Sequence, residues 1–420
     1  MRTPLFLALI LLALVPVAAP AQDAVVTLRD LEREMRANNP EILMARKKAE
    51  AAQEKKAVAS AMPDPMIGFE VQNVGRLSNL TIGEEEMSMR GVVVTQEIPF
   101  PGKLSTMGKA AGKRAEQEQE KERETALKTL NSLRAAYYDY YLAYKSSEIL
   151  AQNKEITKNF QRIAETRYAT GQGIQQDVLR AQLEVSMLLE KIALQEQKKE
   201  AQAAMINSLL GRDPRLPLGR PGDALKTAFD ANLDDISSMA LARSPAVLGK
   251  QRMVEQSEYE LSSSKKEFLP DMVVSAGWFN RGDFTDVWQA SVMFKVPLYF
   301  WNKSAGVRAA SAELGSARYD YESQKLMVLS KVKDLYTMAK TSERLLSLYE
   351  AGIIPQARMA LQSAASNYQV GKIDFLMLLD SQTLLFKYQL AYQEELVNLN
   401  KTIAQIGEAT GTENEDEKAK

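Results

Sequence analysis

The chain has 420 residues, 53 basic and 54 acidic side chains, a formal net charge of −1, and neither cysteine nor histidine. The balanced charge argues against a nucleic-acid partner, and the lack of cysteine excludes disulfide bonds. Without histidine the commonest general base and metal ligand are missing. No nucleophile–base pair, metal motif or phosphate loop is present, so we predict no catalysis, no cofactor and no metal.

The first residues have the pattern of a secretory signal peptide. A basic residue precedes the apolar stretch 5–15, and Ala19-Pro20-Ala21 supplies the small residues at which such peptides are cleaved. We therefore predict a signal peptide over 1–21 and a mature chain that begins near Gln22, with no lipid attached through cysteine. No later run of about 18 apolar residues predicts a transmembrane helix.

After the predicted signal peptide, the chain shows an internal duplication, with two similar segments in succession. Because Gly and Pro mark changes of backbone direction, matched Gly and Pro residues indicate matched architecture. The matched pairs, about 200 residues apart, are Asn39-Pro40 with Ser244-Pro245, Pro63-Asp64 with Pro270-Asp271, Pro99 with Pro297, Tyr168–Gly171 with Tyr368–Gly371, and Leu210-Gly211 with Thr410-Gly411. We predict repeats over 22–211 and 241–411, a linker over 212–240 and a charged, disordered tail over 412–420.

Each repeat is expected to open with a helix, 40–62 or 245–269, followed by two short extended segments, and apolar and polar residues alternate in one segment of each pair, at 67–72 and 287–296. This period of two places the apolar residues on one face of a strand. A length of about 9–11 residues is what a tilted strand needs to cross a bilayer. The predicted strands are about 66–74 and 88–98 in the first repeat, and 272–280 and 287–297 in the second.

A strand of a soluble sandwich would show the same alternation, but the number of strands separates the two possibilities. Four strands cannot close a barrel, and an open sheet edge in lipid leaves backbone groups unpaired. A chain that spans the membrane with these strands must therefore oligomerise.

The rest of each repeat is predicted to be a long helical hairpin, about 102–210 and 302–410. Each outgoing helix would reach roughly 100 Å at about 1.5 Å per residue. The return helix of the first repeat has heptad-like spacing, with Val178, Ala181, Val185, Leu188 and Ile192 separated by three and four residues. Such helices must pack beside others, and we expect the tyrosines between 137 and 144 to pack between helices.

In this order and spacing, the features resemble the TolC family of outer-membrane efflux channels over nearly all of the mature chain. The stretch 96–103, Gln-Glu-Ile-Pro-Phe-Pro-Gly-Lys, looks like the strand-to-helix junction of the branch that exports heavy metals. Tyr168-x-x-Gly171 with Asp177, and Tyr368-x-Val370-Gly371 with Asp380, look like the two hairpin tips of the family.

The resemblance implies a mainly α fold with a small β part. It implies a homotrimer in outer-membrane lipid, in which three times four strands form a 12-stranded β-barrel and the helical hairpins form a periplasmic α-barrel. It also implies two partners, a periplasmic adaptor (membrane fusion protein) that docks on the hairpin tips and an inner-membrane pump that acts through the adaptor.

The resemblance also assigns roles to residues at three places. The adaptor-docking tips are Gly171, Gly173, Val370 and Gly371; the periplasmic gate is Asp380, Asp177 and Lys372; the strand-to-helix junctions are Pro99, Pro101, Gly102 and Pro297. Three Asp380 carboxylates around a threefold axis would attract cations, although ordinary turns and solvated carboxylates would look the same in sequence. Met377 replaces the second acidic ring position of the family, and Ile373 replaces its basic gate partner, so a pairing of Asp177 with Lys372 is a hypothesis.

We therefore expect a passive exit duct for metal ions or small toxic compounds in the outer membrane of a Gram-negative cell, extending into the periplasm. The alternatives are the outer-membrane duct of type I protein secretion and a soluble periplasmic coiled-coil adaptor or structural rod. The duplication and the apolar row from Trp288 to Val296 argue against the rod.

Overall fold

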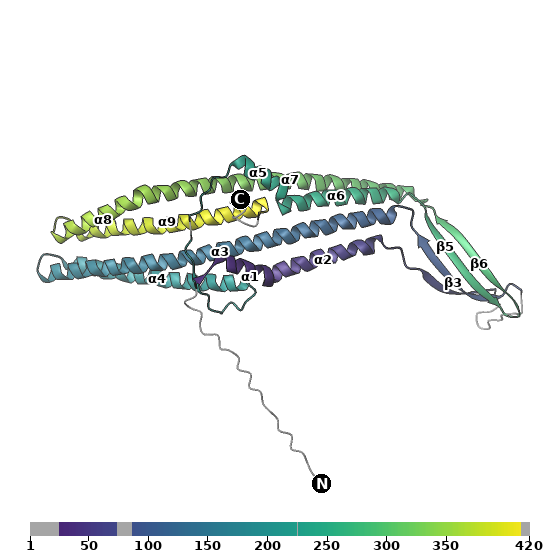
Figure 1. Ribbon diagram of the computed structural model, residues 1–420, viewed down its shortest axis with the longest axis horizontal. Helices are drawn as coiled ribbons and strands as arrows, with labels where there is room; N and C mark the ends of the chain where they lie inside the picture. The colour runs from purple at the N-terminus through teal and green to yellow at the C-terminus, as the bar shows by residue number, and fades with distance from the viewer. Residues whose placement is uncertain (1–24, 74–85, 225, 413–420) are drawn as a thin grey trace, which may run out of the picture. The chain divides into compact units, whose positions relative to one another are not determined.

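The computed structural model describes residues 25–73, 86–224 and 226–412 (Figure 1). The predicted signal peptide and nearly all of the predicted tail lie outside these residues. The chain divides into two compact units, each assembled from three stretches of sequence. The unit named here the sheet unit falls within Pro40–Asn131, Ala228–Glu343 and Thr402–Lys420, and the unit named the tip unit falls within Met1–Asn39, Ser132–Thr227 and Arg344–Lys401.

The sheet unit contains one antiparallel sheet of four strands in the order β2-β3-β5-β6. Its strands are β2 (Met66–Gln72), β3 (Met89–Ile98), β5 (Asp271–Arg281) and β6 (Phe284–Lys295). β6 begins three residues before the expected start because Gly282, with φ of 68°, closes a tight turn after β5. It ends at Lys295 rather than at 297, and Pro297 has no amide proton to donate to a ladder.

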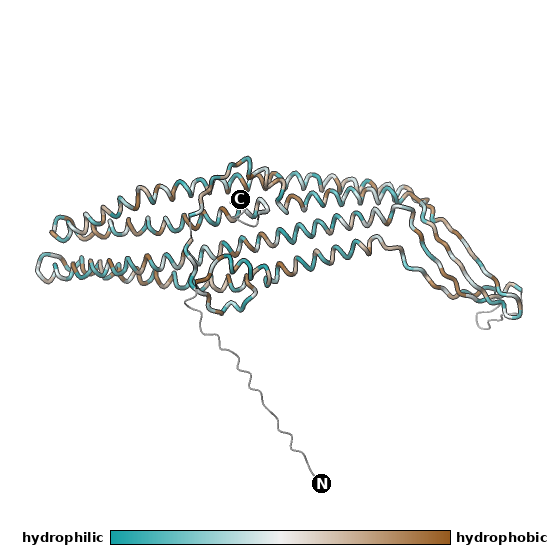
Figure 2. Tube along the Cα trace, viewed as in Figure 1, coloured by the Kyte–Doolittle hydropathy of each residue, from teal (hydrophilic) through white to brown (hydrophobic). Residues whose placement is uncertain are grey.

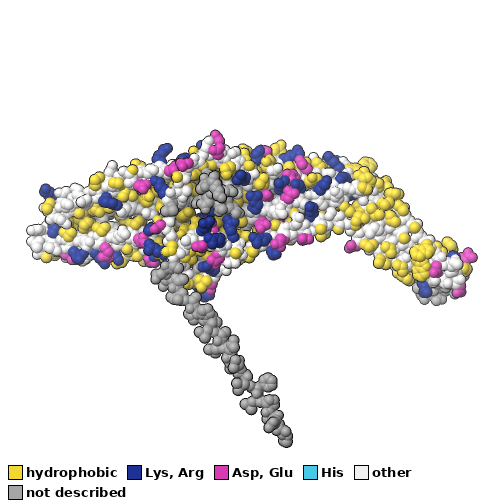
Figure 3. All heavy atoms as spheres, viewed as in Figure 1, with side chains coloured by type: hydrophobic (Ala, Val, Ile, Leu, Met, Phe, Trp, Pro, Cys, Tyr) yellow, Lys and Arg dark blue, Asp and Glu magenta, His cyan; other side chains and the backbone are white. Residues whose placement is uncertain are grey.

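The register of the sheet separates an apolar face from a mixed face. On the apolar face Phe69 lies opposite Val92, Val92 opposite Trp278, and Trp278 opposite Trp288. The mixed face carries hydroxyl and charged side chains, and the Ser275 and Ser291 hydroxyls lie 2.8 Å apart across β5 and β6. Figures 2 and 3 show hydrophobic residues gathered along the strands, whereas charged side chains are spread over the helices. Among the described residues, the outer edges of β2 and β6 have no partner strand.

Four helices of the sheet unit run into or out of these strands. They are α2 (Pro40–Ser60), the first part of α3 (Lys103–Ala169), α6 (Pro245–Lys266) and most of α7 (Phe300–Leu348), and α5 (Leu233–Arg243) leads into α6. Within the expected linker 212–240, α5 begins at Leu233, and Asn232 caps it by accepting a hydrogen bond from the Asp234 amide at 3.4 Å. Ser244 is extended before Pro245, as the proline ring requires.

The tip unit contains the ends of both helical hairpins. Its helices are α1 (Leu28–Asn38), the second part of α3, α4 (Gln175–Leu209), a π-helical turn η1 (Tyr349–Ile353), α8 (Ile354–Gln369) and most of α9 (Phe375–Thr410). The unit also has a short parallel pair, β1 (Val25–Val26) with β4 (Arg220–Pro221). None of the helices in the described part of the chain is both long and apolar enough to cross a membrane.

The tyrosines of α3 are buried, as expected, but they also bind the backbone next to them. The Tyr137 hydroxyl donates to the Val26 carbonyl at 3.1 Å and accepts from the Gly222 amide at 3.0 Å. The Tyr140 hydroxyl lies 3.1 Å from the Gly219 carbonyl oxygen. These contacts hold β1 and the segment around β4 against α3.

Candidate gate at the hairpin tips

The two hairpin tips have the same backbone geometry. Gly171 and Gly371 both have φ of 74°, in the left-handed region that favours glycine. In the first tip the Gln172 amide donates to the Arg167 carbonyl at 2.8 Å, and in the second the Lys372 amide donates to the Asn367 carbonyl at 2.9 Å. Each helix therefore ends in a glycine C-cap that satisfies its last carbonyls and reverses the chain.

Arg167, at the end of α3, connects the first tip to the second. Its Nη2 donates to the Gln172 carbonyl at 3.0 Å, within its own hairpin, and its Nη1 donates to the Tyr368 carbonyl of the other hairpin. The guanidinium also lies 4.8 Å from the centre of the Tyr368 ring, which is close enough for a cation–π interaction. A Cβ at Gly371 would lie 3.2 Å from Arg167 Nη2, so the glycine also makes room for this contact.

Tyr368 and Asp177 form a second link between the hairpins. The Tyr368 side chain is only 2% exposed, and its hydroxyl donates to Asp177 Oδ2 over 3.5 Å, which is a long contact. Burial raises the pKa of Tyr368 to about 12, and the negative charge of Asp177 adds to this. Burial also raises the pKa of Asp177, although the Tyr368 hydroxyl and the Arg167 charge act in the opposite direction.

Apolar packing supports this network from α3, α4, α8 and α9. The rings of Tyr368 and Phe375 lie 5.4 Å apart. The other buried members of the cluster are Phe160, Ala164, Ala181, Ala364, Leu378 and Leu379. Further from the tip, Leu150, Leu188 and Phe386 form a second apolar cluster.

A buried polar layer also crosses the hairpins. The Gln382 Nε2 of α9 donates to Asn153 Oδ1 at 2.5 Å and to Thr157 Oγ1 at 2.7 Å, both on α3. Gln382 Oε1 is buried and has no partner within the described part of the chain. A buried amide without a hydrogen-bond partner lowers the stability of the fold. The layer therefore forms only when α3 and α9 hold these side chains within hydrogen-bonding distance.

The structure brings some of the predicted site residues together and not others. Gly371 and Asp177 join one network through Arg167 and Tyr368, and Gly173 packs closely against Arg167. Val370, Lys372 and Asp380 are exposed, and the described residues contain no ion pair between Asp177 and Lys372. The pairing of Asp177 with Lys372 and the Asp380 ring therefore stay predictions. Sequence reasoning missed Arg167, although its place beside Tyr168-x-x-Gly171 could have marked it.

The predicted strand-to-helix junction contains a buried ion pair that the sequence did not reveal. Lys103 Nζ donates to both carboxylate oxygens of Asp271, at 2.8 and 2.9 Å, and the Phe100 amide donates to Asp271 Oδ1 at 2.7 Å. Gly102, with φ of 89°, presents its carbonyl to Lys266 Nζ at 3.0 Å. Pro99 and Pro101 precede this turn, so the junction fastens the start of α3 to the start of β5.

The junction of the second repeat, after Pro297, is built differently. It leads from β6 into α7 through an exposed apolar segment, 298–301. No charged residue occurs in that segment, and Lys303 in the first turn of α7 pairs with Glu267 of the preceding helical end at 3.0 Å rather than with a carboxylate at the start of a strand.

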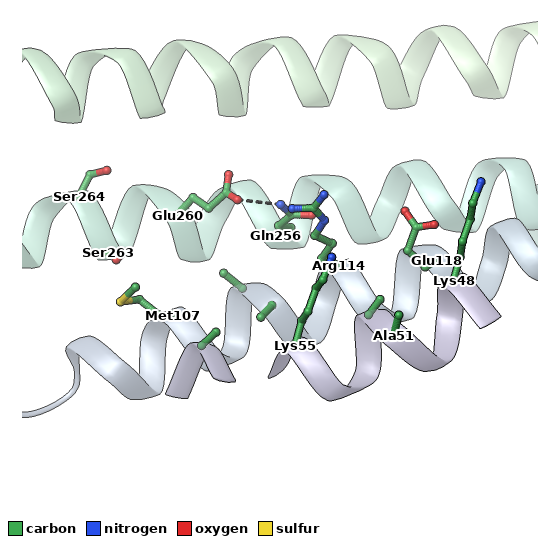
Figure 4. Close-up of a pocket in the computed structure, with 14 residues that line it drawn as sticks. Lys48, Ala51, Lys55, Met107, Arg114, Glu118, Gln256, Glu260, Ser263 and Ser264 are labelled. Carbon is green, nitrogen blue, oxygen red and sulfur yellow. Dashed lines mark hydrogen bonds between the residues drawn. The ribbon is translucent and has the colours of Figure 1, made fainter. Parts of the chain in front are cut away.

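The sheet unit also has a groove of about 650 Å³ between α2, α3 and α6 (Figure 4). Its floor is rich in alanine, and Lys55 and Arg114 extend across it toward α6. On α6 Gln256 donates to Glu260 at 2.7 Å. No cluster of side chains in the described ranges could hold a metal ion.

Comparison with known proteins shows that the sequence matches a protein family in both repeats. The model of the family described as "Outer membrane efflux protein" matches residues 31–212 and 236–412, one stretch for each repeat. The chain is 21% identical over 400 residues to the cation efflux system protein CusC of Escherichia coli (strain K12), which covers 89% of this chain and 83% of that protein. It is 23% identical over 277 residues to the outer membrane efflux protein BepC of Brucella suis biovar 1, which covers 63% of this chain and 59% of that protein.

Solved structures have the same fold. The outer-membrane channel OprN superposes with a TM-score of 0.79 at 20% identity, covering 92% of this chain and 90% of that one. The outer membrane protein VceC from Vibrio cholerae also gives 0.79, at 18% identity, and covers 92% of this chain and 96% of its own. Since the family match includes both repeats and most of the chain, the expected resemblance is confirmed. The chain belongs to the outer membrane efflux protein family, as a TolC-like duct of the outer membrane that reaches into the periplasm and is not an enzyme.

Proposed function

We propose that the chain acts as a homotrimer whose three sheets close a 12-stranded barrel in the outer membrane. The observation that carries this proposal is the four-stranded sheet, which has one apolar face and, among the described residues, two open edges. Open edges in lipid would leave backbone groups without partners. Pairing β6 of one protomer with β2 of the next would satisfy both edges and turn every apolar face outward.

The duct would carry cargo that an inner-membrane pump delivers through a periplasmic adaptor. The tips offer exposed surface for the adaptor, since Val370 is 67% exposed and Ile174 is also exposed. We propose that Gly171, Gly173, Val370 and Gly371 shape this docking surface. A relative is named as a cation efflux protein, and three exposed Asp380 carboxylates would favour cations, so metal ions are the cargo that we propose first.

In the resting duct, the network of Arg167, Tyr368 and Asp177 would hold the two hairpins of each protomer together. Asp380 would meet its two copies at the narrowest point, on the same helix as Gln382 and Phe386. Lys372, which is exposed, would be free to pair with a carboxylate of a neighbouring protomer, and Asp177 is the candidate. Opening would then require the Tyr368 contacts to break.

Cross-linking can test both the trimer and the convergence of Asp380. Because the chain has no natural cysteine, Asp380→Cys gives a protein with one thiol per protomer. We expect the purified protein in detergent to have the mass of a trimer, and a short bis-maleimide to join two copies through residue 380. Glu190→Cys, exposed on α4 and not assigned to the axis, is the matched control.

A monomeric, folded protein as the only species in detergent would overturn the trimer. A trimer in which Asp380→Cys cross-links no better than Glu190→Cys would leave the duct standing and remove Asp380 from the axis.

A further inference from the structure

The groove between α2, α3 and α6 has the size of a small-molecule site. Its volume is about 650 Å³, within the range of about 300–1,000 Å³ that ligand pockets span. Its floor consists of small apolar side chains from α2 and α3, namely Ala51, Ala52, Ala59, Ala110 and Ala111. Met107, which is 46% exposed, adds a flexible thioether to the same lining. The floor can therefore contact the apolar part of a ligand.

Three basic side chains line this groove without a partner of opposite charge. Lys48 and Lys55 on α2 and Arg114 on α3 form no hydrogen bond or ion pair with any residue that the structure describes. Figure 4 shows Lys55 and Arg114 extending across the floor toward α6. The groove therefore combines an apolar floor with positive charge that remains available to a ligand.

The two acidic residues of the lining are already hydrogen-bonded to other groups. Glu118 accepts a hydrogen bond from Lys121 at 2.6 Å, within α3. Glu260 accepts one from Gln256 at 2.7 Å, within α6. Because these carboxylates are engaged along their own helices, they do not pair with the three basic side chains of the groove.

Contacts outside the lining fix the spacing of the three helices. Between α3 and α6, Lys113 pairs with Glu255 at 2.8 Å. Between α2 and α3, a Cβ added at Gly108 would lie only 2.9 Å from the Cβ of Ser60, so the two helices approach closely there. These contacts hold α2 and α6 against α3, and the small side chains of the floor leave the groove open.

The neighbouring groove of the same unit has the opposite character. It measures about 450 Å³ and lies between α3, α6 and α7. Its lining contains four carboxylates, those of Glu118, Glu260, Glu313 and Asp320, and two basic side chains, those of Arg114 and Lys121. Positive charge is therefore confined to the groove beside α2, and an anion would be repelled from the groove beside α7.

We propose that the groove between α2, α3 and α6 binds an amphiphilic organic anion, that is, an apolar body that carries one carboxylate, sulfonate or phosphate group. The apolar body lies on the alanine floor. Lys55 and Arg114 hold the anionic group, since a guanidinium binds such oxygens through two parallel hydrogen bonds. A metal cation would be repelled by the same charges, so this ligand differs from the cation cargo proposed above. The groove lies within one protomer, and the inference does not depend on the trimer.

Two fluorescent probes that differ only in charge test the proposal. Anilinonaphthalene sulfonate is an amphiphilic anion, and phenylnaphthylamine has the same aromatic body without the sulfonate. The full chain is reconstituted into phosphatidylcholine nanodiscs, and each probe is titrated by its emission, with empty nanodiscs subtracted. Lys55→Met with Arg114→Met removes two positive charges from the groove. The matched control is Lys47→Met with Arg123→Met, which removes the same two charges from the same two helices at positions outside the lining, where both residues are ion-paired within their own helix.

We expect the groove variant to bind anilinonaphthalene sulfonate about 10-fold more weakly than the native protein, because hydrogen bonds from charged donors are lost. Its affinity for phenylnaphthylamine should not change, and the control variant should bind both probes as the native protein does. Ala111→Leu fills the floor and keeps every charge, so it should also weaken binding of the anionic probe. Equal affinity of the groove variant and its control for the anionic probe would overturn the proposal. Native affinity of Ala111→Leu for that probe would overturn it as well, because the ligand would then bind elsewhere.

Discussion

Replacing Arg167 with methionine should loosen the contact between the two hairpins of each protomer. The change removes the Nη1 hydrogen bond to the Tyr368 carbonyl and the contact of the guanidinium with the Tyr368 ring. A hydrogen bond from a charged donor contributes about 1.5–3 kcal/mol, and a partly exposed cation–π contact about 0.5–1 kcal/mol. The buried Nε of Arg167, which has no partner among the described residues, offsets part of this sum.

We therefore expect a net loss of about 2 kcal/mol per protomer, which shifts the equilibrium from the closed toward the open tip by about 30-fold. Conductance of the purified protein in planar bilayers measures this shift as a larger fraction of time in high-conductance states. Arg167→Lys keeps the charge but loses the forked geometry of the guanidinium. The fraction of time that this variant spends in high-conductance states should therefore lie between those of the native protein and Arg167→Met.

Arg162→Met is the matched control. It removes the same charge from the same helix, but Arg162 is exposed and hydrogen-bonds to Asn159 one turn before it. If Arg167→Met forms trimers and yet conducts like the Arg162→Met control, Arg167 does not hold the tips together and the reasoning from its contacts is refuted.

Three further predictions concern other charged groups. Burial raises the pKa of Asp177, so its contribution to the closed tip is complete below the usual carboxyl pKa and is lost as pH rises through the raised pKa of Asp177. Asp177→Asn should remove this dependence of conductance on pH in the acid range. An unchanged pH profile of conductance would contradict this prediction. Lys103→Met leaves Asp271 without its buried partner and should cost about 3 kcal/mol of stability, seen as a lower melting temperature than that of the exposed-site control Lys109→Met. Asp380→Asn should preserve the trimer but weaken block of the channel by multivalent cations, and undiminished block would take Asp380 away from the constriction.

Those parts of the fold that depend on neighbouring residues in sequence could be predicted. Alternation in β2 and β6 and the heptad spacing around Ala181 and Leu188 are local patterns that the backbone geometry requires. Gly171 and Gly371 could be assigned to turns because a long helix reverses there. The duplication then gave the order of the elements.

The contacts at the hairpin tips and at the strand-to-helix junction could not be predicted, because they join residues far apart in sequence. Arg167 binds a carbonyl 201 positions away, and Lys103 binds a carboxylate 168 positions away. No periodicity encodes such a pair. The π-helical turn η1 was also missed, although Pro355 just after it lacks the amide proton that a regular helix would use there. Asp380 poses a different difficulty, since its proposed role exists only among three copies.

The polar layer of Gln382, Asn153 and Thr157 determines how the two hairpins can be aligned. The apolar clusters on either side of it, around Tyr368 and around Phe386, would tolerate sliding by a helical turn because apolar contacts are not directional. The Gln382 amide would not, because its two short hydrogen bonds exist in one alignment only. Sliding would strand a buried amide at a cost of about 1–3 kcal/mol. The polar layer thus specifies one axial alignment, so that hairpins which separate and then pack together again return to the same relative position.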